Sequence, residues 1–229
     1  MSLQSTDQAG FRWSAYGLCI LAATTIEVCV PVWAGTQTPG YSHVHQYISE
    51  LGERGAPVGQ FVSLGGFVPV GLFTLIALRI LKPLLPQTRR TSVGIRALMG
   101  VGFGYVAAGL APCDPGCPTR GTLLQNIHTL AGYYHYGGSV LGLALLLRVF
   151  QTREFGRPYL QLTFAGLVLA MLGAFGMLIH PEWKGAFQRI AEFGFFGWAC
   201  CIGFLRGSGS PVRPDAADFQ LESPIREEN

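Results

Sequence analysis

Residues 59–81 read GQFVSLGGFVPVGLFTLIALRIL, and this stretch decides the class of fold. A bilayer's hydrocarbon core is crossed by about 20 mainly apolar residues, and the only charge in this stretch is Arg79, near its end. Five comparable stretches give a set of six, at residues 14–35, 59–81, 93–111, 127–150, 159–179 and 187–205. Lipid offers the backbone no hydrogen-bond partner, so each must be helical. The sequence predicts an all-α polytopic bundle of six transmembrane helices.

The composition agrees with a membrane protein. Only 13% of the 229 residues are charged and 49% are hydrophobic, whereas a soluble domain carries about 25% charged residues. High hydrophobicity with low charge excludes a disordered chain. A net charge of +3 is too small for the basic face of a nucleic-acid-binding protein. We therefore expect membrane lipid as a partner and no nucleic acid, and the sequence identifies no protein partner or cofactor.

The basic residues predict the orientation, because cytoplasmic connections are enriched in Lys and Arg. Of the 16 Lys and Arg residues, only Arg54, Arg120, Lys184 and Arg189 lie in or beside the first, third and fifth connections. Those connections are predicted to be external and both chain ends cytoplasmic, in a multi-pass protein of the plasma membrane. Residues 1–13 are then a cytoplasmic segment, residues 14–206 the transmembrane domain, and the polar residues 207–229 a flexible cytoplasmic tail.

Ionisable residues inside the predicted helices are the first candidate ligand-binding residues. Glu27, His135 and Glu192 share one depth toward the external side, judged from a rise of about 1.5 Å per helical residue. Such groups face the interior of a bundle or a water-filled cavity, although contacts that fix helix packing are an alternative. For His135 the neighbouring Tyr133 and Tyr136 favour anchoring at the membrane interface.

The external connections add further candidates. Arg189 can bind a phosphate or carboxylate through a bidentate fork, or pair with Glu192 three residues later, and Glu50 lies in the first connection. The third connection reads Pro112-Cys113-Asp114-Pro115-Gly116-Cys117-Pro118, which favours turns. The spacing of Cys113 and Cys117 allows a small disulfide loop on an oxidising face, with free thiols as the alternative.

Three groups of residues resemble the signatures of one family. The first is Tyr47-Ile48-Ser49-Glu50-Leu51-Gly52 followed by Gly55-Ala56-Pro57, the second is Pro112–Gly116 followed by Ile127-His128 and Ala131-Gly132, and the third is Gly185, Gln188-Arg189 and Trp198. Over residues 14–206 the chain is similar to a prokaryotic membrane family catalogued as domain-of-unknown-function family 998. The resemblance implies a six-helix membrane protein and no assigned activity.

Three functions fit these residues. We favour a protein that binds a lipid headgroup or another amphiphile at its external face. The alternative is an intramembrane lipid hydrolase or transferase, with Ser49 as nucleophile beside His128 and Asp114. A metal held by His128, His135 and His180 is a second catalytic version. The third hypothesis is a proton-coupled transporter that uses the intramembrane ionisable residues.

Overall fold

The computed structural model describes residues 3–151 and 155–207, and the regular structure in these ranges is helical, without strands. Residues 208–229, most of the predicted tail, lie outside the described residues. The first half of the chain contains α1 (Leu3–Gln37), η1 (Ile48–Gly52), α2 (Gly59–Phe61), η2 (Val62–Phe67), α3 (Val68–Leu81), η3 (Lys82–Leu84) and α4 (Arg89–Leu110). The second half contains α5 (Leu123–Phe150), α6 (Arg157–Ile179), η4 (Pro181–Trp183) and α7 (Lys184–Gly207). Since α1 begins at Leu3, most of the segment expected before the first transmembrane helix is helical as well.

Local chemistry sets where the helices begin. The Thr88 hydroxyl accepts the backbone N–H of Thr91 at 3.1 Å at the start of α4. The Thr122 hydroxyl accepts that of Gln125 at 3.3 Å at the start of α5. Both threonines are N-caps, which satisfy backbone donors that have no partner within the helix. At the start of α6 a proline occupies the first turn, where its missing N–H costs nothing.

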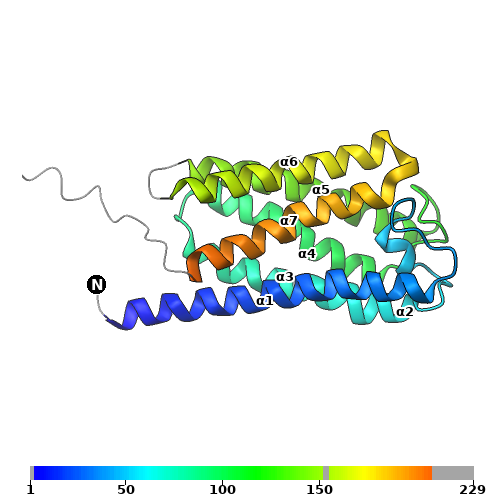
Figure 1. Ribbon diagram of the computed structural model, residues 1–229, viewed down its shortest axis with the longest axis horizontal. Helices are drawn as coiled ribbons and strands as arrows, with labels where there is room; N and C mark the ends of the chain where they lie inside the picture. The colour runs from blue at the N-terminus through cyan, green and yellow to red at the C-terminus, as the bar shows by residue number, and fades with distance from the viewer. Residues whose placement is uncertain (1–2, 152–154, 208–229) are drawn as a thin grey trace, which may run out of the picture.

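The long helices lie side by side along the long axis of the molecule (Figure 1). Neighbours in sequence pack together, from α1 against α3 through α6 against α7, and α7 returns to pack against α1. The connections that contain η1, the α4–α5 loop and η4 gather at one end, which we call the loop end (residues 38–58, 111–122 and 180–183). Figure 1 shows that α1 begins and α7 ends at the opposite end.

The outer surface of the bundle is apolar. Large hydrophobic side chains are exposed along the helices, for example Leu18, Phe164, Leu178 and Phe204, each more than half exposed. Four helical segments are long and apolar enough to cross a membrane: Gly10–Gln37, Gly59–Leu84, Arg89–Leu110 and Arg157–Ile179. The prediction of an all-α protein with membrane-type helices is therefore confirmed. The other two long helices, α5 and α7, carry polar residues of the candidate site.

Glycine permits close approach where α4 crosses α5. A Cβ on Gly100 would lie 2.6 Å from the carbonyl oxygen of Tyr134, and one on Gly104 would lie 2.7 Å from the Cβ of His135. Small residues of this kind let membrane helices pack backbone to backbone. The contact at Gly104 places His135 directly against α4, with its ring in the interior of the bundle.

Candidate functional site

The loop end is held by Arg189, which was a predicted ligand-binding residue. Its Nη1 donates to the carbonyl oxygens of His43 at 2.8 Å and Gly185 at 3.0 Å. Its Nη2 donates to the hydroxyl of Tyr41 at 2.9 Å and to Nδ1 of His43 at 2.7 Å. Burial, together with the charge of Arg189, lowers the pKa of His43, and the neutral ring can accept this bond. The guanidinium therefore ties the first connection to α7 and does not line the cavity described below.

Glu50 has a comparable role within the first connection. Its Oε1 lies 2.7 Å from Nζ of Lys184 and accepts the backbone N–H of Tyr47 at 3.0 Å. Its Oε2 accepts the amide of Gln46 at 3.1 Å. The carboxylate is buried and both oxygens have partners. It therefore closes the turn before η1 and joins it to the start of α7.

The third connection is closed by the disulfide between Cys113 and Cys117. The turn between them has positive φ at Gly116 (77°) and Cys117 (44°). The Asp114 carboxylate accepts the backbone N–H and the hydroxyl of Thr122, both at 2.9 Å, and pairs with Arg54. The hydrogen bond from the Thr122 backbone and the charge of Arg54 lower the pKa of Asp114. Asp114 thus joins the first and third connections at the start of α5.

A cavity of about 370 Å³ lies beneath these loops. Its wall is formed by η1, η2, the α4–α5 loop, α4, α5, α6 and α7. Most of the wall is apolar or aromatic, including Phe67, Ala108, Ala174 and Met177. Ligand cavities in proteins measure about 300–1,000 Å³ and combine such walls with a few placed polar groups. Two of the lining side chains, Tyr133 on α5 and Leu178 on α6, are 61% and 70% exposed. The rim of the cavity therefore reaches the outer surface of the bundle.

One wall of the cavity is a buried polar network built on Glu192. Nε2 of His135 lies 3.3 Å from Glu192 Oε2, and the two side chains are 8% and 3% exposed. The hydroxyl of Tyr136 donates to Oε1 at 3.0 Å. The Gln188 amide donates to the Tyr136 hydroxyl at 2.8 Å and accepts the backbone N–H of Ile48 at 2.6 Å. Oε2 of Glu192 has no hydrogen bond. The ring of Tyr105 lies beside this network, 5.2 Å from the ring of His135. We call Tyr105, His135, Tyr136, Gln188 and Glu192 the polar wall.

The structure brings His135 and Glu192 together, as their shared depth predicts, but places Glu27 differently. Glu27 lies on α1 in a narrow crevice with Ile48, Phe67 and Tyr105 on its walls. These three residues also line the cavity, so they stand between it and Glu27. Arg189 does not pair with Glu192, although the two are three residues apart, because the loop carbonyls bind its guanidinium.

Ser49, His128 and Asp114 do not form a catalytic triad. Ser49 and His128 both line the cavity. In a triad the acidic residue accepts a hydrogen bond from the Nδ1–H of the histidine. Here Nδ1 of His128 lies 3.0 Å from the carbonyl oxygen of Ala111, and the Asp114 carboxylate binds Thr122 and Arg54 instead. A carbonyl oxygen can only accept, so Nδ1 carries a proton, and in the neutral ring Nε2 is then an acceptor.

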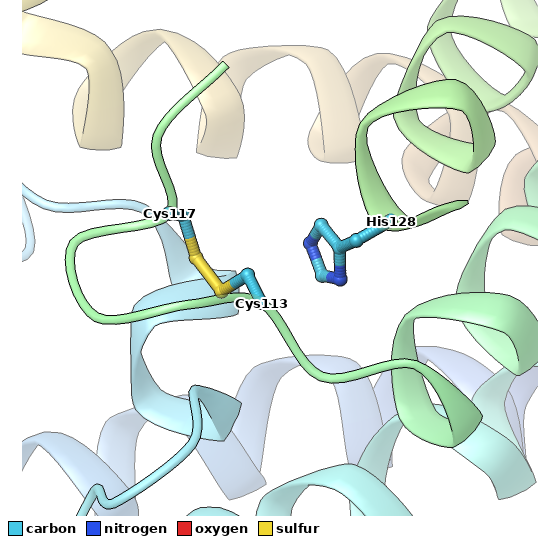
Figure 2. Close-up of side chains that lie close together, drawn as sticks. All are labelled: Cys113, Cys117 and His128. Atoms are coloured by element: carbon cyan, nitrogen blue, oxygen red, sulfur yellow. A yellow bond between two sulfur atoms is a disulfide. The ribbon is translucent and has the colours of Figure 1, made fainter. Parts of the chain in front are cut away.

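The three predicted metal-binding histidines are also divided. His128 and His135 line the cavity, whereas His180 is exposed and lies 3.2 Å from Glu182. Within the described residues, Cys113, Cys117 and His128 are the group whose ligand atoms lie close enough to hold a metal, within 4.8 Å of one another. Figure 2 shows the His128 ring directed toward the two sulfur atoms. Both sulfurs are joined in the disulfide, and a thiolate is the form that binds a metal.

Tyr105, Tyr136 and Gln188 are the polar-wall residues that sequence reasoning did not select as ligands. Tyr136 was expected to anchor the helix at the membrane interface, but its hydroxyl lies inside the bundle on Glu192. A signal for Gln188 exists, because it precedes Glu192 by four residues on α7, and residues four apart share a helix face. Tyr105 leaves no comparable sequence signal.

The fold and the cavity define a helical membrane protein with a largely apolar cavity near one end. A family model described as "Protein of unknown function (DUF998)" matches residues 21–205. The chain therefore belongs to this family, as its signature residues predict. No curated protein and no solved structure matches the chain.

Proposed function

We propose that this protein spans the plasma membrane with six helices and both chain ends in the cytoplasm, and that its cavity binds a lipid or another amphiphile from the external leaflet. The cavity carries this proposal: it is mainly apolar, it has a polar wall, and its volume of about 370 Å³ is that of a ligand site. An amphiphile has the same division between an apolar and a polar part.

The position of the cavity supports access from lipid. Its rim includes the exposed side chains Tyr133 and Leu178, on helices whose outer surfaces are apolar. With the loop end external, the rim lies at the level of the outer leaflet. An acyl chain can then enter between α5 and α6 while its polar end reaches the polar wall.

Binding is favoured over catalysis by the partners of the candidate catalytic groups. Nδ1 of His128 binds a backbone carbonyl at 3.0 Å, and Asp114 is held by Thr122 and Arg54. No acid therefore orients His128 toward Ser49, as acyl transfer by a triad requires. We therefore propose that the cavity binds an amphiphile without forming or breaking a covalent bond.

The proposal is tested by filling the cavity. Gly132 lines it, and a Cβ added there meets no atom within 4 Å, so Gly132→Phe places a ring in open space. A Cβ on Gly17 of α1 also meets no atom within 4 Å, and Gly17 does not line the cavity. Gly17→Phe is therefore the matched control.

The measurement is native mass spectrometry of the protein extracted from cell membranes into a maltoside detergent. We expect the wild-type chain and Gly17→Phe to retain an amphiphile and Gly132→Phe to lose it. Equal retention by all three chains, or no retained amphiphile in the wild type, would show that this cavity is not the binding site.

A further inference from the structure

The cavity is lined by an acidic side chain but by no lysine or arginine among the described residues. Among the described residues that line it, Glu192 is the carboxylate, the only other ionisable groups are histidines, tyrosines and the disulfide-bonded Cys117, and neither Lys nor Arg is present. An ionised Glu192 beside a neutral His135 makes the polar wall negative, and beside a protonated His135 it makes the wall neutral. In neither state does the wall offer a positive charge to an anionic headgroup.

The basic residues of the loop end are directed elsewhere. Arg54 pairs with Asp114, and Lys184 pairs with Glu50 at 2.7 Å. Arg189 donates to the carbonyl oxygens and side chains of the first connection. Arg120 is exposed and does not line the cavity. The positive charge expected at an external anion site is therefore absent from the cavity wall.

The Glu192 carboxylate is the lining group most able to pair with a cation. Its side chain is 3% exposed and lines the cavity. Oε1 accepts from Tyr136, whereas Oε2 has no hydrogen bond, with Nε2 of His135 3.3 Å away. A buried carboxylate oxygen without a donor is costly, and a donor or a cation from a ligand would remove that cost.

Aromatic rings surround this carboxylate. The His135 ring stacks on Tyr136 at 4.4 Å and lies 5.2 Å from the ring of Tyr105, which in turn lies 6.0 Å from Phe67. All four residues line the cavity. The faces of aromatic rings attract cations, and more strongly in a site from which water is excluded. A carboxylate among aromatic rings is the environment in which an ammonium group binds well.

From this arrangement we propose that the ligand of the cavity is an amphiphile with an ammonium headgroup, which pairs with Glu192 and lies against the rings of Tyr105 and Tyr136. The inference rests on the proposed function, since it names the charge of the molecule that the cavity holds. Two sources offer this chemistry: membrane lipids with an amine or choline headgroup, and soluble lipophilic amines.

The experiment compares three probes that share a six-carbon chain: hexyltrimethylammonium, hexanol and hexyl phosphate. Each is titrated by calorimetry into the protein in a maltoside detergent, whose headgroup is uncharged. Hexyltrimethylammonium should bind at least about tenfold more tightly than the other two. Glu192→Gln should abolish the preference, because its amide keeps an oxygen for Tyr136 but removes the charge. Glu182→Gln, an exposed acid outside the cavity, should retain it.

The outcomes separate the two proposals. Equal binding of the three probes, or tighter binding of hexyl phosphate, overturns the ammonium headgroup and leaves amphiphile binding intact. If none of the three binds, both proposals fail. Tetramethylammonium tests the need for an apolar chain: much weaker binding than hexyltrimethylammonium supports an amphiphile, whereas equal binding supports the charge and overturns the amphiphile. The native mass spectrum of the wild-type chain distinguishes the two sources, because a lipid retained from the cell membrane is identified by its mass. If Glu192→Gln does not fold, the preference of the wild-type protein among the three probes still tests the charge of the ligand headgroup.

Discussion

The charged groups that join the loops above the cavity are fully paired, whereas the carboxylate of the polar wall is not. In the loops, Glu50 has a partner for each carboxylate oxygen, Asp114 is held by Thr122 and Arg54, and Arg189 binds the first connection. In the polar wall, the more deeply buried Glu192 keeps one oxygen without a hydrogen bond. Charges with complete sets of partners hold the loops together, whereas the incompletely paired Glu192 lies in the cavity that we propose to be a binding site.

The physical reason is the cost of an unsatisfied buried group. Leaving a buried acceptor without a partner costs about 1–3 kcal/mol, and such exceptions in a folded protein ask for an explanation. Selection for stability alone would remove Glu192 or supply a second donor. Under the proposed function, a ligand supplies the missing partner to a carboxylate that lines the cavity. The following variants test whether the loops are structural and the polar wall is functional.

The largest effect is expected for Arg189→Ala. The change removes the donors to the His43 and Gly185 carbonyls and to the Tyr41 hydroxyl. We expect a loss of about 3 kcal/mol in stability, measured as thermal unfolding in detergent. Arg120→Ala, which removes an exposed arginine of the third connection, should leave stability unchanged. A stable Arg189→Ala protein that no longer retains an amphiphile would instead make Arg189 a ligand-binding residue.

A smaller effect is expected for Tyr136→Phe. Loss of the hydroxyl leaves the Gln188 amide without its acceptor at 2.8 Å and Glu192 Oε1 without its donor at 3.0 Å. The free energy of unfolding should fall by about 2 kcal/mol, as read from denaturant or thermal unfolding. Tyr134→Phe alters an exposed tyrosine on the same helix and should cause no change. Equal stability of the two variants would show that the polar wall is not a connected network.

The smallest effect is expected at Asp114, because its pairing with Arg54 is partly exposed and such pairs contribute little. The pKa of Asp114 is lowered in the folded protein. The paired carboxylate therefore adds stability above its unfolded pKa of about 3.9, and that stability is lost as the pH falls through the lower folded value. Asp114→Asn should be less stable than the wild type at pH 7. The difference should shrink as the pH approaches 3, in thermal unfolding followed across this range. A difference independent of pH would assign the effect to lost hydrogen bonds rather than to charge.

The membrane character of the chain and part of the site were predictable from the sequence. Long apolar stretches such as residues 59–81 require helices, and a glutamate at the depth of Glu192 requires a protein interior. The sequence predicts that Glu192 and His135 lie at the same depth in the membrane. It does not predict that they pair, because depth does not say which helices are neighbours. Arg189 shows the limit most clearly: its chemistry suits an anion, but loop carbonyls surround it.

By itself, the sequence determined that this protein is helical, belongs to a membrane family and keeps its histidines toward one end. Hydrophobic length and charge position are properties of each segment, so no tertiary contact is needed to read them. Only the tertiary structure decided that η1, η2 and α4 to α7 enclose a cavity, with His135 and Glu192 3.3 Å apart on one of its walls. That outcome depends on contacts between segments distant in sequence, such as Gly104 against His135, where the fit of side chains rather than their hydrophobicity selects the neighbour.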